Sequence, residues 1–576
     1  MTRARFAPRP LLLAALGLPA LFVVGCADTT QRTGAETPAF VAQEAVNDIV
    51  LTGSRIIAPS EPAPPPPPPP PPVPAPVMMM SAQRIGMPLP PHAPPFSMTG
   101  RDRFTPIKQN AFQRVAEAPV STFSLDVDTA SYAFVRASLN RGTLPPRDAV
   151  RTEELVNYFP YDYAPAKSAA EPFSTDLSVF PSPWAPGRLI VRVGVRGYDL
   201  TRTTRPRANL VFLVDTSGSM MKPNKLPLVK QSLQLLLDSL GENDRVAIVA
   251  YAGQAGTVLE PTPASDRTRI LAALDRLEAG GSTAGAEGIR QAYALAERDF
   301  DPKGVNRVIL ATDGDFNVGI TDQDQLKGYI EAERTKGVYL SVLGFGMGNY
   351  NDALMQTLAQ NGNGVAAYID TLNEARKTLV TEASSSLFPI AKDVKVQVEF
   401  NPAAVAEYRL IGYENRLLAR EDFNNDKVDA GDVGAGRTVT ALYEVVPVGG
   451  ARTVDPLRYG KNAKVSAVKA RAAELGFVKI RYKLPKASTS RLIARPIPVA
   501  HAARFADAPR DARFATAVAG FAELLRGGTY EGRFGYDDVA RIAAGAKGAD
   551  PFGYRAEFID LVAKARAAQA MPPLVR

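Results

Sequence analysis

The sequence predicts an α/β fold, in which a doubly wound, mainly parallel sheet is flanked by a β-rich sandwich with C-terminal helices. The first observation is an unbroken apolar run at 208–214, which is typical of a strand covered on both faces. Second, strand-like and helix-like segments alternate from about 205 to 387, as a doubly wound sheet requires. Third, segments in which apolar and polar residues alternate lie on both sides of that region, which indicates half-buried strands there.

The pattern inside the central region predicts its elements in chain order. We expect strands at 208–214, 245–251, 306–312, 338–345 and 366–369. We expect helices, in which apolar residues recur with the helical period, at 228–240, 267–278, 286–298 and 323–336. In an open α/β sheet of this kind, ligands bind outside the carboxyl ends of the strands. A site is therefore expected at that edge.

Both flanks of the central region carry further strands and helices. Before it, we expect strands at 123–127 and 189–198 and helices at about 132–139 and 152–159; after it, strands at 394–400, 438–446 and 477–483 and helices at 512–526, 537–546 and 555–568. Because domain termini often lie close together, one hypothesis is that the central domain is inserted into a β-sandwich made from both flanks. Near the first strand, we expect Asp126 and Asp128 to face solvent and Ser131 to cap the helix.

Oxygen-bearing side chains follow the central apolar strand. Asp215, Ser217 and Ser219 alternate, so a tight turn can point three oxygens at one place. A second apolar run ends likewise at Asp313, and Thr283 lies at the start of an amphipathic helix. A hard divalent cation such as Mg²⁺ takes about six oxygen ligands and keeps some waters. Taken singly, Asp215 and Thr283 can also be interpreted as helix caps, which explains each residue but not the set.

These five positions resemble the metal-ion-dependent adhesion site of the von Willebrand factor type A family, with D-x-S-x-S, then a loop threonine, then an aspartate. The resemblance implies that hydroxyls of Ser217, Ser219 and Thr283 ligate Mg²⁺ (or Mn²⁺ or Ca²⁺), while Asp215 and Asp313 act directly or through water. Two carboxylates only just neutralise such a cation. An open coordination position can then attract a carboxylate, so the resemblance implies a protein partner that presents Asp or Glu.

Length and charge exclude some classes of function. A chain of 576 residues is too long for one core at typical domain sizes. The formal net charge of +8 is spread along the chain without a long Lys/Arg run or an aromatic-interleaved basic patch, so no nucleic-acid partner is indicated.

Three glycines, Gly344, Gly346 and Gly348, invite a dinucleotide interpretation, but Asn349 stands where G-x-G-x-x-G needs its third glycine. Because a metal-type motif already occupies the same sheet edge, we expect no dinucleotide to bind there.

The N-terminus has the pattern of an exported lipoprotein. Residues 1–25 place Arg3, Arg5 and Arg9 ahead of a short apolar stretch, as in a signal peptide. The residues that end at Cys26 resemble a bacterial lipobox, and this single cysteine of the chain is the expected lipidation site. Alanine rather than aspartate follows it, which resembles sorting to the outer membrane in Gram-negative lipoproteins. We therefore expect a lipid-anchored protein of the cell envelope, at the outer membrane and facing the periplasm or the surface.

The predicted domains follow from these signals. Residues 26–103 form a disordered, Pro-rich tether, and the proline run 64–72 favours a polyproline II spacer of roughly 30 Å. Residues 104–200 form an N-terminal region associated with the type A domain, 205–387 the type A domain itself, and 390–570 a C-terminal mixed β/α domain. This arrangement resembles a group of bacterial type A domain lipoproteins, and membership of that group establishes no catalytic function.

Catalysis lacks the residues that it would need. His92 lies in the tether and His501 stands alone, so Ser-His or Cys-His chemistry has no base and zinc has no ligand set. The main hypothesis is therefore a binding protein and not an enzyme, in which a partner carboxylate completes the metal's coordination. Two alternatives stay open. In one, the protein is an envelope scaffold whose flanking domains bind and whose metal is structural; in the other, the metal assists hydrolysis.

Overall fold

The computed structural model describes most of the chain after residue 101. The described residues are 102–125, 128–201, 205–282, 285–314, 323–348, 350–455 and 473–571. The signal peptide, Cys26, most of the tether, Asp126 and Thr283 lie outside the described residues. Within the described ranges, no helix combines the length and the apolar character that crossing a bilayer requires.

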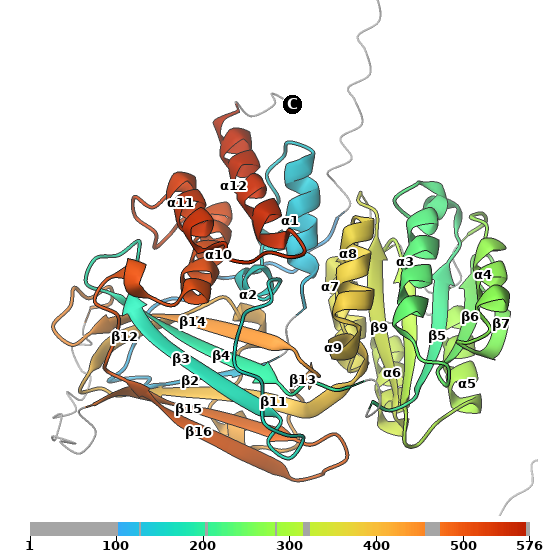
Figure 1. Ribbon diagram of the computed structural model, residues 1–576, viewed down its shortest axis with the longest axis horizontal. Helices are drawn as coiled ribbons and strands as arrows, with labels where there is room; N and C mark the ends of the chain where they lie inside the picture. The colour runs from blue at the N-terminus through green and yellow to red at the C-terminus, as the bar shows by residue number, and fades with distance from the viewer. Residues whose placement is uncertain are drawn as a thin grey trace, which may run out of the picture. The chain divides into compact units, whose positions relative to one another are not determined.

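A doubly wound sheet forms the central domain (208–387), as the sequence predicts (Figure 1). Its strands are β5 (Ala208–Asp215), β6 (Arg245–Tyr251), β7 (Ala255–Pro263), β8 (Val305–Thr312), β9 (Val338–Phe345) and β10 (Ala366–Ile369). They lie in the order β10-β9-β8-β5-β6-β7. All pairs are parallel except that of the edge strand β7, which runs antiparallel to β6. The carboxyl ends of the parallel strands therefore share one edge.

Helices cover both faces of this sheet, as a doubly wound fold requires. One face carries α3 (Leu226–Ser239), α4 (Arg267–Asp275), α8 (Leu372–Arg376), the π-helical turn η4 (Lys377–Thr381) and α9 (Ala383–Leu387). The other face carries α5 (Gly285–Arg298), α6 (Gln323–Lys336) and α7 (Asp352–Asn361). The predicted helices are all present, and α7, α8, α9 and the edge strand β7 are additions that the sequence analysis did not expect.

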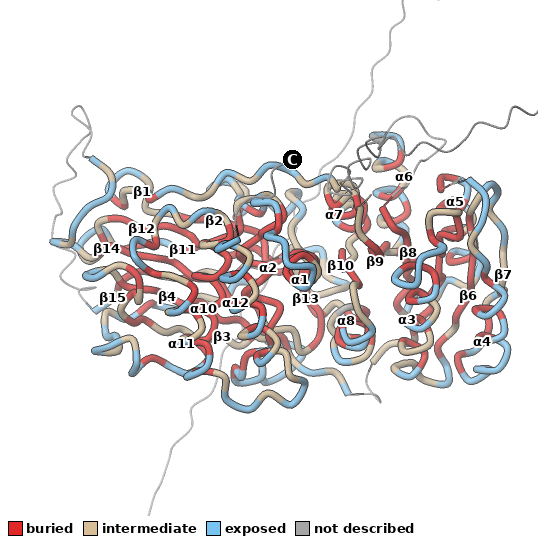
Figure 2. Tube along the Cα trace, turned by 90° about the horizontal axis from the view of Figure 1, so that it is seen from above, coloured by how far each residue is buried: buried red, intermediate tan, exposed pale blue. Residues whose placement is uncertain are grey.

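Strand β5 lies inside the sheet, between β8 and β6, and is buried along its whole length. Figure 2 shows buried residues in red in this part of the sheet, between the labels β9 and β6. Leu210, Phe212 and Val214 belong to the apolar cluster that contains α3 and α4. Val211 and Leu213 belong to the cluster that contains α5, α6 and α7. Because both faces of the strand are covered by helices, its residues are apolar without alternation. The prediction made from this apolar run is confirmed.

The two flanks of the chain build one β-sandwich. Its strands are β1 (Gln113–Arg114), β2 (Val120–Ser124), β3 (Phe173–Pro181), β4 (Leu189–Gly197), β11 (Pro389–Phe400), β12 (Val405–Ile411), β13 (Gly431–Gly434), β14 (Thr438–Pro447), β15 (Glu474–Lys483) and β16 (Ser490–Pro498). One sheet has the order β1-β12-β14-β4-β3, and the other has β13-β11-β15-β16 with β2 paired to β11. Strand β4 precedes the central domain and pairs with β14, which follows it. The central domain is therefore inserted into the sandwich.

Helices form a third layer on the sandwich. They are α1 (Ala130–Asn140), α2 (Thr152–Val156), α10 (Arg510–Arg526), α11 (Tyr536–Ala546) and α12 (Tyr554–Ala570). Their apolar side chains form a common cluster with Phe180, Ile190, Ile411 and Leu442 of the β12-β14-β4-β3 sheet. Neighbouring residues of these strands point into the separate cluster between the two sheets. Figure 1 shows α12 beside α1, so helices from both flanks pack together.

A buried arginine joins the flanks to the central domain. Arg136 on α1 is 2% exposed. Its guanidinium donates to Asp370 at 2.9 Å and to Glu374 at 2.8 Å, and both acids belong to the central domain. It also donates to Tyr158 at 2.9 Å and to Glu557 on α12 at 3.0 Å. Partners from three parts of the chain thus converge on one cation, and the planar guanidinium fixes their relative directions.

Asp128 corrects one expectation from the sequence. It does not face solvent, since it is 2% exposed. Its carboxylate accepts from Arg416 at 3.0 Å and from the backbone N–H of Ala366 at 2.9 Å. These partners are 288 and 238 residues away, so no local pattern could reveal them. The expectation for Ser131 is also wrong, because its hydroxyl donates to the carbonyl of Ala149 at 2.6 Å and α1 has no side-chain cap.

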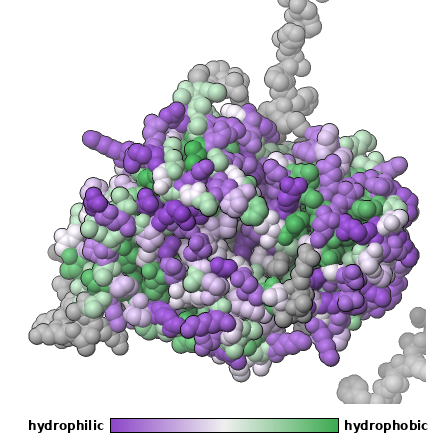
Figure 3. Space-filling model, in the orientation of Figure 1, coloured by the Kyte–Doolittle hydropathy of each residue, from purple (hydrophilic) through white to green (hydrophobic). Residues whose placement is uncertain are grey.

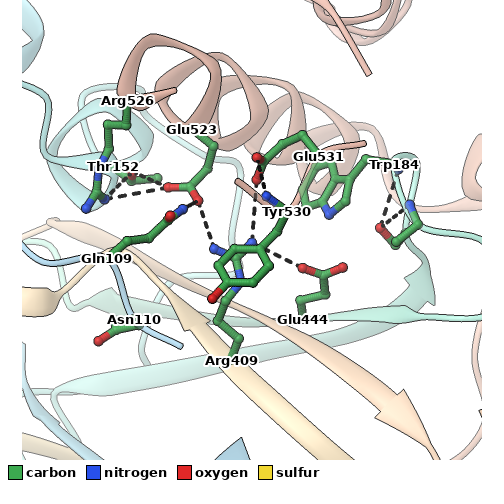
Figure 4. A network of polar contacts seen from close by, with 12 residues as sticks. Gln109, Asn110, Thr152, Trp184, Arg409, Glu444, Glu523, Arg526, Tyr530 and Glu531 are labelled. Carbon is green, nitrogen blue, oxygen red and sulfur yellow. Dashed lines mark hydrogen bonds and ion pairs between the residues drawn. The ribbon is translucent and has the colours of Figure 1, made fainter. Parts of the chain in front are cut away.

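A second buried network binds the helical layer to the sandwich (Figure 4). Arg409 on β12 donates to Glu523 of α10 at 2.8 Å and to Glu444 of β14 at 3.1 Å. Glu531 lies 3.6 Å from the same guanidinium, and all four side chains are at most 1% exposed. Three carboxylates therefore crowd around one arginine. Burial raises the pKa of Glu531 to about 7, and the charge of Glu523 adds to the rise while Arg409 opposes it.

We expect Glu531→Gln to reduce the loss of stability that occurs as the pH rises from 5 to 8. From pH 5 to about 7, the folded chain holds a proton on Glu531 that the unfolded chain, with an ordinary pKa of about 4.3, has already released. The folded state binds more protons, so its stability falls as the pH rises. Urea unfolding at both pH values should show that wild type loses about 1–3 kcal/mol more than the variant. Equal losses would contradict this, and the exposed change Glu421→Gln should retain the wild-type loss.

Candidate metal centre

The carboxyl ends of β5 and β8 bring two acids together. Asp215 is the last residue of β5, and Asp313 directly follows β8. The two strands pair in parallel with Val214 opposite Ala311, so both acids leave the sheet at the same edge. Both carboxylates are buried, with 0% exposure. This is the edge at which the sequence predicts a metal site.

Hydrogen bonds orient the Asp215 carboxylate. Its Oδ1 accepts from the backbone N–H of Ser217 at 2.9 Å, and its Oδ2 accepts from the Thr312 hydroxyl at 3.1 Å. The Oγ atoms of Ser217 and Ser219 are 3.0 Å apart. Ser219 lies in the single-turn helix η3 (Gly218–Met221), which follows β5 at once. The structure thus brings the side chains of Asp215, Ser217 and Ser219 together within one short turn.

The loop that leads to Thr283 is fastened to the same turn. The N–H of Gly218 donates to the carbonyl of Gly281 at 3.0 Å, and the N–H of Gly280 donates to the carbonyl of Thr216 at 2.8 Å. Gly281 has a φ of +80°, which glycine adopts without the strain that other residues incur. Thr283 itself lies outside the described residues, two positions beyond this contact. Its role as a ligand stays a prediction.

The electrostatics of the site favour a cation. Burial raises the pKa of Asp215, the hydrogen bonds from Ser217 oppose the rise, and the charge of Asp313 adds to it. Tyr251 ends the neighbouring strand β6 and is paired in register with Asp215. Its pKa is raised well above the ordinary value, first by burial and then by the charge of Asp215. Two buried carboxylates at one edge are costly unless positive charge is near them.

A buried lysine supplies one such charge. Lys225 precedes α3, and its side chain is 4% exposed. Its Nζ donates to Oδ2 of Asp313 at 2.6 Å. Sequence reasoning missed this residue, because a lysine in the polar stretch before a helix is typical of an exposed position. No spacing within the motif indicates that its side chain turns inward.

The donor set fits a hard divalent cation. The hydroxyls of Ser217 and Ser219 and the carboxylates of Asp215 and Asp313 supply the oxygen ligands that Mg²⁺, Mn²⁺ and Ca²⁺ prefer. Among the described residues, no group of three or more His, Cys, Asp or Glu side chains comes together as a metal-binding cluster. A cation here would therefore depend on hydroxyl oxygens beside two carboxylates. Mg²⁺ held in this way keeps water in part of its coordination shell.

Two glycines, Gly344 inside β9 and Gly346 just after it, have structural explanations. A Cβ at Gly344 would lie 2.4 Å from the ring of Tyr350. A Cβ at Gly346 would lie 2.5 Å from Cε of Lys225. Both positions thus need glycine because a side chain from elsewhere packs against the backbone. These contacts account for the two glycines without a bound phosphate.

Three family models match successive parts of the chain. A family model described as the von Willebrand factor type A domain matches residues 209–382. A model described as von Willebrand factor matches residues 98–192. A third, described as the C-terminal part of the uncharacterized protein YfbK, matches residues 385–568. The resemblance inferred from the D-x-S-x-S motif is confirmed at the level of the family.

Of two relatives, one matches most of the chain and the other about a third of it. The uncharacterized protein YfbK of Escherichia coli (strain K12) is 46% identical over 471 residues, which are 80% of this chain and 81% of that protein. The uncharacterized protein sll0103 of Synechocystis is 29% identical over 197 residues, 34% of this chain and 45% of that protein.

Solved structures with a similar fold include two proteins that are 16% identical to the chain. One is a von Willebrand factor type A protein from Catenulispora acidiphila, with a TM-score of 0.37 over 65% of this chain and 87% of that one. The other is the ArnB paralog VWA2 from Sulfolobus acidocaldarius, with a TM-score of 0.33 over 69% and 98%.

We expect Thr312→Val to destabilise the chain by about 1–3 kcal/mol. Valine keeps the shape, but the buried Asp215 carboxylate loses its donor at 3.1 Å and the N–H of Gly314 loses its acceptor at 3.2 Å. Urea unfolding of the variant and of wild type measures the effect. Thr335→Val on the exposed side of α6 is the matched control and should stay within about 0.5 kcal/mol of wild type. A Thr312→Val chain as stable as wild type would show that this hydroxyl does not support Asp215.

Proposed function

The chain belongs to the family of the uncharacterized protein YfbK of Escherichia coli, and we propose that it is a binding protein of the cell envelope. Its von Willebrand factor type A domain suggests protein–protein interaction or adhesion. In the proposal, a divalent cation is held by the five residues that the motif predicts, namely Asp215, Ser217, Ser219, Thr283 and Asp313. A carboxylate of the partner completes its coordination.

One observation carries this proposal. The Asp215 carboxylate is held by two hydrogen bonds, and the hydroxyls of Ser217 and Ser219 meet beside it at the edge where Asp313 emerges. The described members of the donor set, Asp215, Ser217, Ser219 and Asp313, thus lie at one edge of the sheet. When bound, Mg²⁺ (or Mn²⁺ or Ca²⁺) would supply a Lewis-acidic position for an anionic oxygen. The protein's own residues position the cation and exclude water from its inner side.

We also propose that the centre has no catalytic role. Ser217, Thr312 and Lys225, which contact the two acids, act as hydrogen-bond donors and not as a general base. His501 is exposed, and its Nδ1 lies 3.0 Å from the carbonyl oxygen of Val499 in the C-terminal part. His92 lies outside the described residues. Hydrolysis that depended on Mn²⁺ or Mg²⁺ occupancy would contradict this part of the proposal.

The surface favours a localised polar contact. Figure 3 shows that polar residues dominate the face seen in Figure 1 and that apolar residues lie in smaller, separate groups. Beside the candidate metal centre, Met221 is 65% exposed on η3, and it is followed by the exposed Lys222. A partner would thus find one apolar and one basic side chain at the rim of the site. We infer that an acidic side chain of the partner enters the centre and that neighbouring groups contact this rim.

For localisation, we propose a lipid anchor at Cys26, followed by the Pro-rich tether. The support is in the sequence, in which the lipobox-like segment and the proline run precede the first described residues. Anchoring by acyl chains needs no membrane-spanning helix. The folded part would then be held at the envelope, with the outer membrane as the expected site.

We expect Asp215→Ala to abolish metal-dependent partner capture and to leave the fold intact. The change removes the carboxylate around which Ser217 and Thr312 are arranged. The measurement has two parts: Mn²⁺ binding by calorimetry, and capture of envelope proteins with Mg²⁺ or with EDTA. Circular dichroism and thermal unfolding verify the fold.

The matched control is Asp238→Ala, an exposed acid on α3 that pairs with Arg267 at the surface. This variant should bind Mn²⁺ and partner as wild type does. Partner capture that persists in EDTA and in the Asp215→Ala variant would contradict the proposal. It would transfer binding to the flanking sandwich and leave a structural role for the metal.

We expect Cys26→Ser to release the protein from membranes. Without the thiol, no acyl chain can be attached, and the signal sequence alone is too short to hold the chain in a bilayer. Detergent phase partitioning of cell extracts should place wild type in the detergent phase and the variant in the aqueous phase. Equal partitioning of the two proteins would contradict the lipid anchor.

A further inference from the structure

Lys225 reaches the candidate metal centre from inside the domain. Its side chain is 4% exposed, and its Nζ donates to Oδ2 of Asp313 at 2.6 Å. Asp313 is itself 0% exposed. A buried ammonium in direct contact with a buried carboxylate interacts strongly, because solvent screens it little. Lys225 is therefore part of the electrostatics of the centre, although it offers no oxygen to a cation.

The loop between β9 and α7 is shaped around the stem of this lysine. Gly346 has a φ of +73°, and a Cβ there would lie 2.5 Å from Cε and 2.8 Å from Cγ of Lys225. The carbonyl of Gly346 accepts from the Tyr368 hydroxyl at 2.9 Å, which holds the backbone in place. A larger residue at this position would push the stem away from Asp313. The ammonium is thus directed to the carboxylate by packing and not only by charge.

We propose that Lys225 is a positioning residue that sets the charge of the metal centre and thereby its selectivity for an anionic partner. The inference rests on the proposed metal-dependent function. Asp215 and Asp313 alone would cancel the charge of a divalent cation. With Lys225 bonded to Asp313, a divalent cation and these three described side chains together carry a net positive charge.

Two consequences follow from this charge. First, the cation is bound less tightly than it would be by two carboxylates without an ammonium beside them, because the lysine repels it. Second, a carboxylate that approaches the filled centre is attracted more strongly than it would be by a neutral one. Lys225 thus lowers the affinity of the centre for the cation and raises its affinity for the acidic partner. The same bond restrains Asp313, which then presents its carboxylate in one orientation.

The test is calorimetric titration of the purified chain with Mn²⁺ alone. Lys225→Met keeps an unbranched stem of similar length and removes the charge. We expect this variant to bind Mn²⁺ at least about tenfold more tightly than wild type, since a buried like charge near the cation is removed. Lys303→Met is the matched control. It removes the same charge from an exposed side chain just before β8, at the opposite edge of the sheet, and should bind Mn²⁺ within about twofold of wild type.

The outcomes separate this inference from the proposed function. If wild type binds no Mn²⁺, the proposed function fails, and the inference falls with it. If wild type binds Mn²⁺ and Lys225→Met binds it equally or more weakly, the inference alone is overturned. A weaker affinity would mean that the lysine serves only to hold Asp313 in place.

A second variant keeps the test decisive if Lys225→Met does not fold. Gly346→Ala retains the lysine but places a methyl group 2.5 Å from Cε, so the lysine stem must shift, and we expect the contact of the ammonium with Asp313 to be weakened. We expect tighter Mn²⁺ binding, by about two- to tenfold, with thermal unfolding as the check on folding. A folded Gly346→Ala chain with wild-type Mn²⁺ affinity would contradict the role given to this contact.

Discussion

The ion pairs around Arg136 are the interaction on which the arrangement of the domains depends. A guanidinium with 2% exposure is costly to bury unless acids surround it, and here the acids come from the central domain and from Glu557 on α12. Arg151 acts in the same way before α2, with Asp352 at the start of α7 at 2.7 Å. Because the cost of desolvation offsets much of the attraction, such pairs define orientation more than they add stability. They join the inserted domain to both flanks of the chain.

The N-terminal flank and the candidate metal centre meet at one loop. On one side of the loop between β9 and α7, Gly346 packs against Lys225. Farther along it, the N–H groups of Gly348 and Tyr350 donate to Asp102 at 3.0 and 2.9 Å. Asp102 is the first described residue and lies at the end of the predicted tether. The segment that would lead to the membrane is therefore fastened to the same loop that directs a charge into the metal centre.

Much of the fold could be predicted because its signals are local. The bounds of α6 and β9 coincide with those expected from periodicity, and the D-x-S-x-S spacing places its oxygens within one turn. The edge strand β7 was missed because Gly256, Pro261 and Pro263 hide a strand pattern that pairing with β6 alone supports. Asp128 was misjudged and Lys225 was missed for another reason. Their partners lie 288 and 88 residues away, and only the assembled tertiary structure brings them together.

The candidate centre and the expected anchor would each lower a different part of the free-energy cost of binding a partner. A single carboxylate on a single cation is a small contact, and association must offset the lost freedom of both proteins. The centre reduces this cost because hydrogen bonds already hold Asp215 in place. A membrane anchor with a Pro-rich spacer would reduce it again by confining the domain to the layer in which an envelope partner resides. A weak and exchangeable contact then suffices, which agrees better with a mainly polar face than a permanent interface does (Figure 3).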